Sequence, residues 1–402
     1  MKIFAQHGAH EGDKLTSGLS KGLIDGIIFS PKDISIQRLK ERLNLLPQFP
    51  QTELLLDPQF YASLIAEISA ARLGYLVSEY PYFASRRRNQ LEREKNVAKD
   101  VRATLEFQVN QGFQCLVAPN ISISKSFDST EASIAKRFVW LAREVHDDMR
   151  RTEKVYATLS VHRDVLADTT SLQEFLDDLT NMDAKPDGFY LLVGADNAED
   201  RTDIVNPNTI AAWMLINYAL KTNGFEIING YSDLLTPLLG AVGGDAGGIG
   251  WSTTLRTFSL NRFSPSRGGG GGTRVKKYFC SALLNRLRAT ELDLVRLRVP
   301  GLLNKLATDD LYPIDAGSTP DSFTDEILQS WDAMHLTCSR LLVAGDIQQS
   351  LKNCLSAIVE AEALYAQIAP LTLLSRQTKP DHLEAMRDGI DKFAHLAEID
   401  LS

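Results

Sequence analysis

Short apolar runs recur along the first two-thirds of the chain, and most are followed by a stretch whose apolar positions recur at helical spacing. Eight of these runs end in small or polar residues: 2–6, 26–30, 53–57, 114–119, 155–161, 188–193, 225–229 and 247–251. Strands that alternate with helices are typical of βαβ units and a parallel sheet. Eight such units predict an α/β fold, a closed (β/α)8 barrel of the TIM type.

The segments between these runs carry the patterns of amphipathic helices. Residues 35–46 and 129–151 each place apolar side chains on one helical face, which favours packing against a sheet. Asn206 and Pro207 open a strongly apolar stretch and are typical of a helix start. The third crossover, from Asp57 to Gln114, is longer than a βα unit needs. We therefore expect an insertion after the third strand, at about residues 75–100.

Beyond Trp251 the pattern changes, and helix-like stretches dominate. These stretches span 278–299, 321–344, 347–368 and 382–397, and the pattern shows no strand-like run among them. We expect the first of them to close the barrel as its eighth helix. The expected domains are therefore a barrel at residues 1–300 and a C-terminal helical region at residues 301–402.

Composition and charge narrow the class of protein. The 402 residues are 44% hydrophobic and 23% charged, which is typical of a globular chain. A net charge of −8 argues against a surface that coats nucleic acid throughout, but it allows local basic patches. No stretch stays apolar over the roughly 20 residues that a membrane helix needs, and the first apolar run is too short for a signal peptide. We therefore expect a cytoplasmic protein that does not enter a membrane.

The four cysteines are scattered along the chain at Cys115, Cys280, Cys338 and Cys354. Their spacing contains no CxxC pair, so it indicates neither a zinc site nor a disulfide framework. We expect them to serve as small buried apolar groups, and we expect no resident metal or cofactor.

The carboxyl ends of the strands are where barrel enzymes place their chemistry, and Asp57 is the first candidate there. It directly follows the apolar run 54–56, so it stands at the rim of an apolar interior. Partial burial raises the pKa of a carboxyl group and suits it to proton transfer or nucleophilic attack. The alternative is that Asp57 caps its own turn, as an aspartate before proline commonly does.

Two histidines, His7 and His162, follow the first and fifth strands at equivalent positions. Each is expected to act as an acid, a base or a metal ligand, or else to make only a hydrogen bond at the mouth. Together with Asp57 they also allow a metal-dependent lyase or hydrolase. Substrate contacts are expected from polar and aromatic side chains at other strand ends, namely Gln59, Tyr61, Asn120, Asn229, Tyr231 and Trp251.

Two basic segments are candidates for contacts with nucleic acid or phosphate. Arg86, Arg87 and Arg88 follow three aromatic residues, a combination that suits phosphate contacts and base stacking. The alternative is a helix start whose charges pair one turn further on. The second segment surrounds five glycines, 268–272, with the cations Arg267, Arg274, Lys276 and Lys277. It is expected either to cradle a phosphate or to form a flexible loop.

Three segments resemble barrels of the tRNA-guanine transglycosylase type: DGIIFSPKD at 25–33, LLLDPQFY at 54–61 and the stretch 224–251. In that family an aspartate after an apolar strand works at the guanine site, and Asp57 occupies the corresponding place. Gly248 stands where the family has its nucleophilic aspartate, with Asp245 close by as a candidate catalytic carboxylate. The family's CxCxxC zinc motif is absent. The resemblance implies a barrel that acts on a nucleobase or nucleic acid, with altered or lost base exchange.

A different class of function stays open beside this one. The missing nucleophile and the lack of a complete catalytic motif favour a non-catalytic barrel that serves as a binding or scaffold subunit. The C-terminal helices are then the surface for a protein partner, because residues 347–368 carry an apolar stripe at helical spacing. The same stripe would equally suit packing against the barrel.

Overall fold

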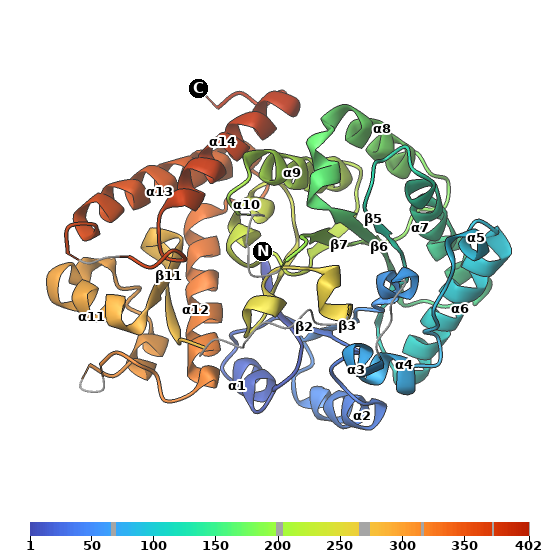
Figure 1. Ribbon diagram of the computed structural model, residues 1–402, viewed down its shortest axis with the longest axis horizontal. Coiled ribbons are helices and arrows are strands. Elements are labelled where there is room, and N and C mark those ends of the chain that lie inside the picture. The colour runs from blue at the N-terminus through green and yellow to red at the C-terminus, as the bar shows by residue number, and fades with distance from the viewer. Residues whose placement is uncertain (66–69, 198–203, 265–273, 315–316, 372–373, 402) are drawn as a thin grey trace.

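The computed structural model describes residues 1–65, 70–197, 204–264, 274–314, 317–371 and 374–401. Eight parallel strands form a barrel at the positions that the sequence predicts (Figure 1). They are β1 Lys2–Gln6, β2 Gly26–Phe29, β3 Glu53–Leu56, β4 Cys115–Ala118, β6 Lys154–His162, β7 Gly188–Gly194, β8 Glu226–Asn229 and β9 Ala246–Ile249. A two-residue strand, β5 Ser122–Ile123, pairs with the end of β6. The predicted (β/α)8 barrel is thus confirmed.

The barrel is nearly closed. Its strands pair in the order β3-β2-β1-β9-β8-β7-β6-β4, and each neighbouring pair is parallel. β1 lies between β2 and β9, the last strand of the barrel, since Phe4 is in register with Gly26 and Lys2 with Ala246. Strands of a parallel sheet are covered on both faces, which explains why they appear in the sequence as near-continuous apolar runs.

Helices follow most strands and pack around the barrel: α1 Lys14–Ser20, α2 Ile36–Leu45, α6 Glu94–Gln111, α7 Thr130–Asp148, α8 Thr169–Thr180, α9 Pro207–Thr222 and α10 Thr236–Ala241. Two of the predicted starts are confirmed by their caps. The Ser129 hydroxyl accepts a hydrogen bond from the Ala132 amide at 3.2 Å, just before α7. The Asn206 side chain accepts one from the Thr209 amide at 3.2 Å, and Pro207 takes the first position of α9.

The long crossover after β3 packs against the barrel through short helices, α3 Ala70–Leu73, α4 Tyr75–Ser78 and α5 Arg88–Leu91, before α6 begins. Tyr80, Tyr82 and Phe83 are buried within it. The Tyr80 hydroxyl donates to the carbonyl of Ile34 at 3.0 Å, and the Tyr82 hydroxyl donates to that of Pro58 at 3.2 Å. These aromatic rings therefore belong to the core, and the prediction that they stack on bases is wrong.

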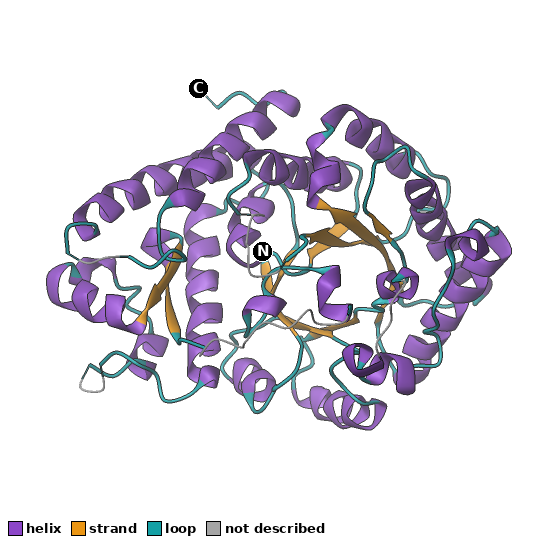
Figure 2. Cartoon of the chain, viewed as in Figure 1, coloured by secondary structure: helices purple, strands orange, loops and turns teal. Residues whose placement is uncertain are grey.

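The stretch 278–299 is a helix only in its second half, so that prediction is wrong for its first half. An antiparallel hairpin, β10 Lys277–Cys280 and β11 Asn285–Arg288, comes first, and α11 Ala289–Arg298 follows it (Figure 2). The amide of Gln329 holds both the backbone N–H and the carbonyl of Phe279, at 2.9 and 2.8 Å. Since Tyr278, Phe279 and Cys280 are all buried, the strand shows no alternation that distinguishes it from a helix.

The eighth position around the barrel is filled by α12 Phe323–Leu341 instead of by residues 278–299. Its Trp331 indole N–H donates to the carbonyl of Ile249 in β9 at 3.1 Å, and its ring packs against Gly18 of α1. The C-terminal half of the chain thus completes the ring of helices. The domain boundary at residue 300 stays a prediction.

Two further helices, α13 Ile347–Ile368 and α14 Asp381–Leu396, pack outside α10, α12 and α9 (Figure 1). The rings of Tyr218 in α9 and Phe393 in α14 meet edge to face, 5.7 Å apart. Gly389 of α14 lies directly against Ile210 of α9. Within the described residues, no helix combines the length and the apolar character that crossing a bilayer requires.

Candidate functional site

Asp57 lies at the carboxyl end of β3, fully buried in the mouth of the barrel. Its Oδ2 accepts hydrogen bonds from the hydroxyls of Tyr61 and Tyr190 at 2.8 and 3.3 Å, and its Oδ1 accepts one from the Gln59 amide at 3.1 Å. Burial raises the pKa of the Asp57 carboxyl to about 6, although these hydrogen bonds act to lower it. A carboxyl group that titrates near neutrality is suited to general acid–base catalysis.

Arg262 supplies the positive charge nearest this group of side chains. Its guanidinium donates to the Tyr231 hydroxyl at 2.7 Å and to Asp33 Oδ2 at 3.1 Å. Although burial acts to raise the pKa of Asp33, the charges of Arg262 and Lys32 hold it below its ordinary value. Asp33 is thus an ionised partner for Arg262, whereas Asp57 is the carboxyl group that can exchange its proton near neutral pH.

Gln59 braces the loops after β2 and β3. Its Nε2 donates to the Ser30 hydroxyl at 2.8 Å, and its Oε1 accepts from the Lys32 amide at 2.9 Å. Its backbone has a φ of 54°, in the left-handed region, just before the 3-10 helix that carries Tyr61. The side chain predicted to bind substrate is therefore engaged in holding the mouth together.

Residues 252–264, which follow β9, lie across the mouth. The ring of Phe258 packs against Tyr61 and Tyr231, with centroids 4.8 and 5.5 Å away, and Phe263 packs against Tyr61 at 5.6 Å. The Ser259 hydroxyl ties this segment to the Asp196 carbonyl at 2.8 Å. This segment therefore packs over the side chains around Asp57.

The two histidines lie in separate environments. His7 is buried, and its Nε2 lies 3.2 Å from Glu11, which also pairs with Arg42 at 2.6 Å. His162 Nε2 lies 3.1 Å from Asp196. Across the described residues, the one group of three possible ligands with atoms within 4.8 Å of one another is His162, Asp164 and Asp196, and both aspartates are exposed. The structure does not bring His7, Asp57 and His162 together into the metal site that the alternative of a metal-dependent lyase or hydrolase would need.

Three of the predicted substrate contacts are structural braces at other points of the barrel. The Asn120 amide donates to the Thr158 carbonyl at 2.7 Å, and the Trp251 indole donates to that of Ala9 at 2.8 Å. Asn229 accepts from the Trp213 indole at 2.8 Å, behind β8. Of the six, Gln59, Tyr61 and Tyr231 lie beside Asp57 or Arg262.

Asp245 lies at the opposite end of the barrel, because it precedes β9 rather than following it. Its carboxylate pairs with Lys221 at 2.6 Å and accepts a hydrogen bond from the Ile227 amide at 2.8 Å. At Gly248, an added Cβ would lie only 2.8 Å from Oε1 of Gln6. The prediction that Asp245 works with Asp57 is therefore wrong, and Gln6 fills the space beside Gly248 that a second carboxylate would need.

The arginines of the first basic segment line a surface hollow of about 1120 Å³. Arg86 makes two hydrogen bonds to Asp100, at 3.0 and 2.6 Å, and Arg88 reaches Glu131 at 3.3 Å. Arg87 is exposed and is itself the residue that precedes α5. Nucleic-acid binding by this segment stays a prediction that now depends on the arginines alone.

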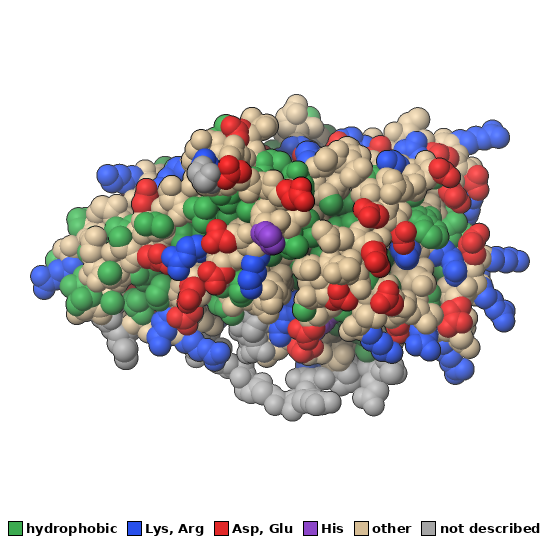
Figure 3. All heavy atoms as spheres, turned by 90° about the horizontal axis from the view of Figure 1, so that it is seen from above, with side chains coloured by type: hydrophobic (Ala, Val, Ile, Leu, Met, Phe, Trp, Pro, Cys, Tyr) green, Lys and Arg blue, Asp and Glu red, His purple; other side chains and the backbone are tan. Residues whose placement is uncertain are grey.

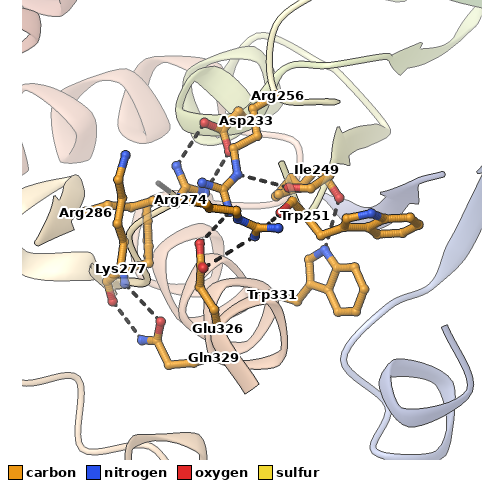
Figure 4. Close-up of polar contacts among 12 residues, drawn as sticks. Asp233, Ile249, Trp251, Arg256, Arg274, Lys277, Arg286, Glu326, Gln329 and Trp331 are labelled. Carbon is orange, nitrogen blue, oxygen red and sulfur yellow. Dashed lines mark hydrogen bonds and ion pairs between the residues drawn. The ribbon is translucent and has the colours of Figure 1, made fainter. Parts of the chain in front are cut away.

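The cations of the second basic segment connect the barrel to the C-terminal region. Arg267 and glycines 268–272 lie outside the described residues. Arg274 donates to the Trp251 carbonyl and lies 3.4 Å from Glu326 (Figure 4). Lys276 donates to the carbonyls of residues 320 and 321. Lys277 donates to the Gln377 side chain. These contacts hold the three described cations within the fold.

Two residues of this site were not predicted from the sequence: Tyr190, which contacts Asp57, and Arg262, which contacts Asp33. Tyr190 lies in the middle of β7, where a tyrosine looks like any core aromatic, so no signal was available. Arg262 opens the glycine-rich segment and was a visible cation, but its distance from Asp33 along the chain hid the pairing.

The face seen in Figure 3 shows Lys and Arg side chains intermixed with Asp and Glu, without a broad area of one sign. This distribution agrees with the argument from net charge against a surface that coats nucleic acid. No protein-family model matches the chain, and a search of curated proteins finds no match to it either.

Proposed function

We propose that this barrel is an enzyme in which Asp57 transfers a proton to or from a substrate held in the mouth. The observation that carries the proposal is the setting of Asp57: a fully buried carboxyl at a strand end, with a pKa of about 6, between two tyrosine hydroxyls. Perturbed carboxyl groups at the carboxyl ends of barrel strands are typical of active sites. Residues 252–264 act as the cover that admits substrate and then excludes water.

A nucleobase is the substrate class that we propose. Gln6 is fully buried in the same interior, and neither atom of its amide makes a regular hydrogen bond, although it interacts with the Tyr190 hydroxyl. A base edge presents adjacent donors and acceptors, which the Asp57 carboxyl and the Gln6 amide complement. The resemblance to transglycosylase-type barrels supports the same substrate class. Gln6 occupies the space beside Gly248, which argues against base exchange through a second carboxylate.

A non-catalytic barrel is the second candidate, and the covered mouth favours it. Asp57, Tyr231 and Phe263 are each at most 1% exposed, and Arg262 fastens the cover to Asp33. In this interpretation Asp57 is a structural hydrogen-bond acceptor, and the protein serves as a binding or scaffold subunit through its surface.

The two candidates are separated by thermal unfolding with guanine, adenine, cytosine and uracil as free bases. For the enzyme we expect one base to raise the Tm of the wild type, because it binds only the folded state, and Asp57→Asn to abolish the shift. Asp128→Asn, an exposed aspartate in the loop after β5, is the matched control and should keep the shift.

Activity gives the second measurement. With the stabilising base as labelled substrate, Asp57→Asn should lower turnover by about 10²–10⁴-fold, the usual contribution of a general acid or base. A wild type that no base stabilises, or a folded Asp57→Asn protein with full base binding, would sink the proposal and favour the non-catalytic barrel.

A further inference from the structure

Three side chains of the kinds that bind metals lie together at the carboxyl ends of β6 and β7. His162 is the last residue of β6 and is in register with Gly194, the last residue of β7. Asp164 follows His162 by two residues, and Asp196 follows Gly194 by two residues. Because β6 and β7 are parallel neighbours, these side chains meet at the end of the barrel where (β/α)8 proteins place their chemistry (Figure 1).

The distances among these side chains are close to those in a metal centre. His162 Nε2 lies 3.1 Å from Asp196 Oδ1, and His162 Nδ1 lies 3.6 Å from Asp164 Oδ2. One nitrogen of His162 and one oxygen of each aspartate all lie within 4.8 Å of one another. Nitrogen and oxygen ligands that share one Zn²⁺ at about 2.0–2.2 Å are roughly 3–3.5 Å apart. Rotation of the two aspartate side chains is therefore enough to close the site.

The imidazole and the backbone of this group are held in place, whereas the carboxylates can turn. His162 Nδ1 accepts a hydrogen bond from the Asp164 amide at 3.3 Å, which orients the ring with Nε2 toward Asp196. The Asp196 carbonyl accepts from the Ser259 hydroxyl at 2.8 Å and from the Asn261 side chain. The side chains of Asp164 and Asp196 are 71% and 72% exposed, so water has access to an ion between them. A ligand set that is largely ordered in advance loses little conformational entropy on binding.

A cation beside the group leaves the ligand atoms accessible. Arg163 Nε lies 3.5 Å from Oδ1 of Asp164, whereas the oxygen on the His162 side is Oδ2. One oxygen of Asp164 can therefore bind an ion while the other keeps its contact with Arg163. An outer partner of this kind orients a ligating carboxylate, as the hydrogen bonds around metal ligands commonly do.

The donor set indicates the class of ion. Imidazole nitrogen suits Zn²⁺ and similar divalent ions, whereas Mg²⁺ and Ca²⁺ take oxygen ligands. Zinc sites with three protein ligands keep a position open for water or substrate. We propose that His162, Asp164 and Asp196 bind one Zn²⁺-like divalent ion, with water at its open position. The ion supplies a Lewis acid at the same end of the barrel as Asp57. Because no cysteine takes part, the spacing of the cysteines gave no sign of this site.

Calorimetric titration of the full chain tests this site, after treatment with a chelator and dialysis, with Zn²⁺ and Mg²⁺ as probes. We expect one Zn²⁺ per chain, bound about tenfold or more tightly than Mg²⁺. The affinity for Zn²⁺ should be lower at pH 5 than at pH 7, because protons compete for the imidazole. Asp164→Asn and Asp196→Asn should each weaken Zn²⁺ binding by about tenfold or more, and His162→Gln should abolish it. Equal affinities for Zn²⁺ and Mg²⁺ would overturn the role of the imidazole.

A matched control makes the result specific. His395→Gln combined with Asp128→Asn changes an exposed histidine and an exposed aspartate elsewhere, and it should leave Zn²⁺ binding unchanged. The two exposed aspartates keep the test valid if His162→Gln does not fold. No binding of Zn²⁺ by the wild type, wild-type affinity in both aspartate variants, or equal losses in these variants and the control would refute the site. The titration needs no substrate, and Asp57→Asn should bind Zn²⁺ as the wild type does, so this outcome is independent of the proposed catalysis.

Discussion

Asp57 is the residue whose ionisation should leave the clearest mark on stability. Its pKa is about 6 in the folded protein and near its ordinary value of 3.8 when the chain unfolds. The folded state therefore holds the proton more tightly, and ionisation as pH rises from about 4 to above 6 destabilises it, by about 3 kcal/mol in full. Asp57→Asn cannot ionise and should lose this part of the pH dependence. Urea unfolding at pH 4.5, 5.5 and 7 measures it.

The control at this scale is again Asp128→Asn, whose exposed carboxyl should leave the wild-type pH profile in place. Unfolding free energies of Asp57→Asn that run parallel to those of the wild type across the three pH values would contradict the raised pKa.

At the scale of elements, the contact between α1 and α12 fixes the eighth helix of the barrel. A Cβ added at Gly18 would lie 2.8 Å from the Trp331 ring, which is fully buried and hydrogen-bonded to β9. Alanine is the better helix former by up to about 1 kcal/mol, but overpacking a rigid core costs about 1–3 kcal/mol. Gly18→Ala should therefore destabilise the protein, as denaturant unfolding will show.

A double-mutant cycle identifies the cause. In a Trp331→Leu background the ring is gone, and Gly18→Ala should become neutral or stabilising. The same loss in both backgrounds would mean that α12 does not constrain α1 in this way.

At the scale of the whole molecule, the last barrel helix lies far along the chain from the first strand that it covers. A fragment of residues 1–300 lacks α12 and exposes the outer face of β1 and β9. We expect it to bind hydrophobic dyes and to unfold without a cooperative transition. A fragment of residues 1–344 retains α12 and should unfold cooperatively, with reduced stability because α14 no longer packs on α9. A cooperative 1–300 fragment of near-native stability would contradict the placement of α12.

The sequence by itself determined the strands of the barrel and the end at which Asp57 lies. Strands covered on both faces must be apolar throughout, so they stand out as short runs, and a residue that follows such a run is at the carboxyl end. The same property concealed β10, since Tyr278, Phe279 and Cys280 are apolar without alternation. Only the packing of this stretch distinguishes a strand from a helix.

The tertiary structure alone decided which side chains surround Asp57 and which acidic side chain Arg256 meets. Tyr190 reaches Asp57 across 133 residues and Arg262 reaches Asp33 across 229, because closing the barrel brings distant strand ends to one mouth. Arg256 meets Glu326 only because α12 returns to complete the barrel. Periodicity reports which face of an element is buried, but the partner at that face depends on how all the elements pack together.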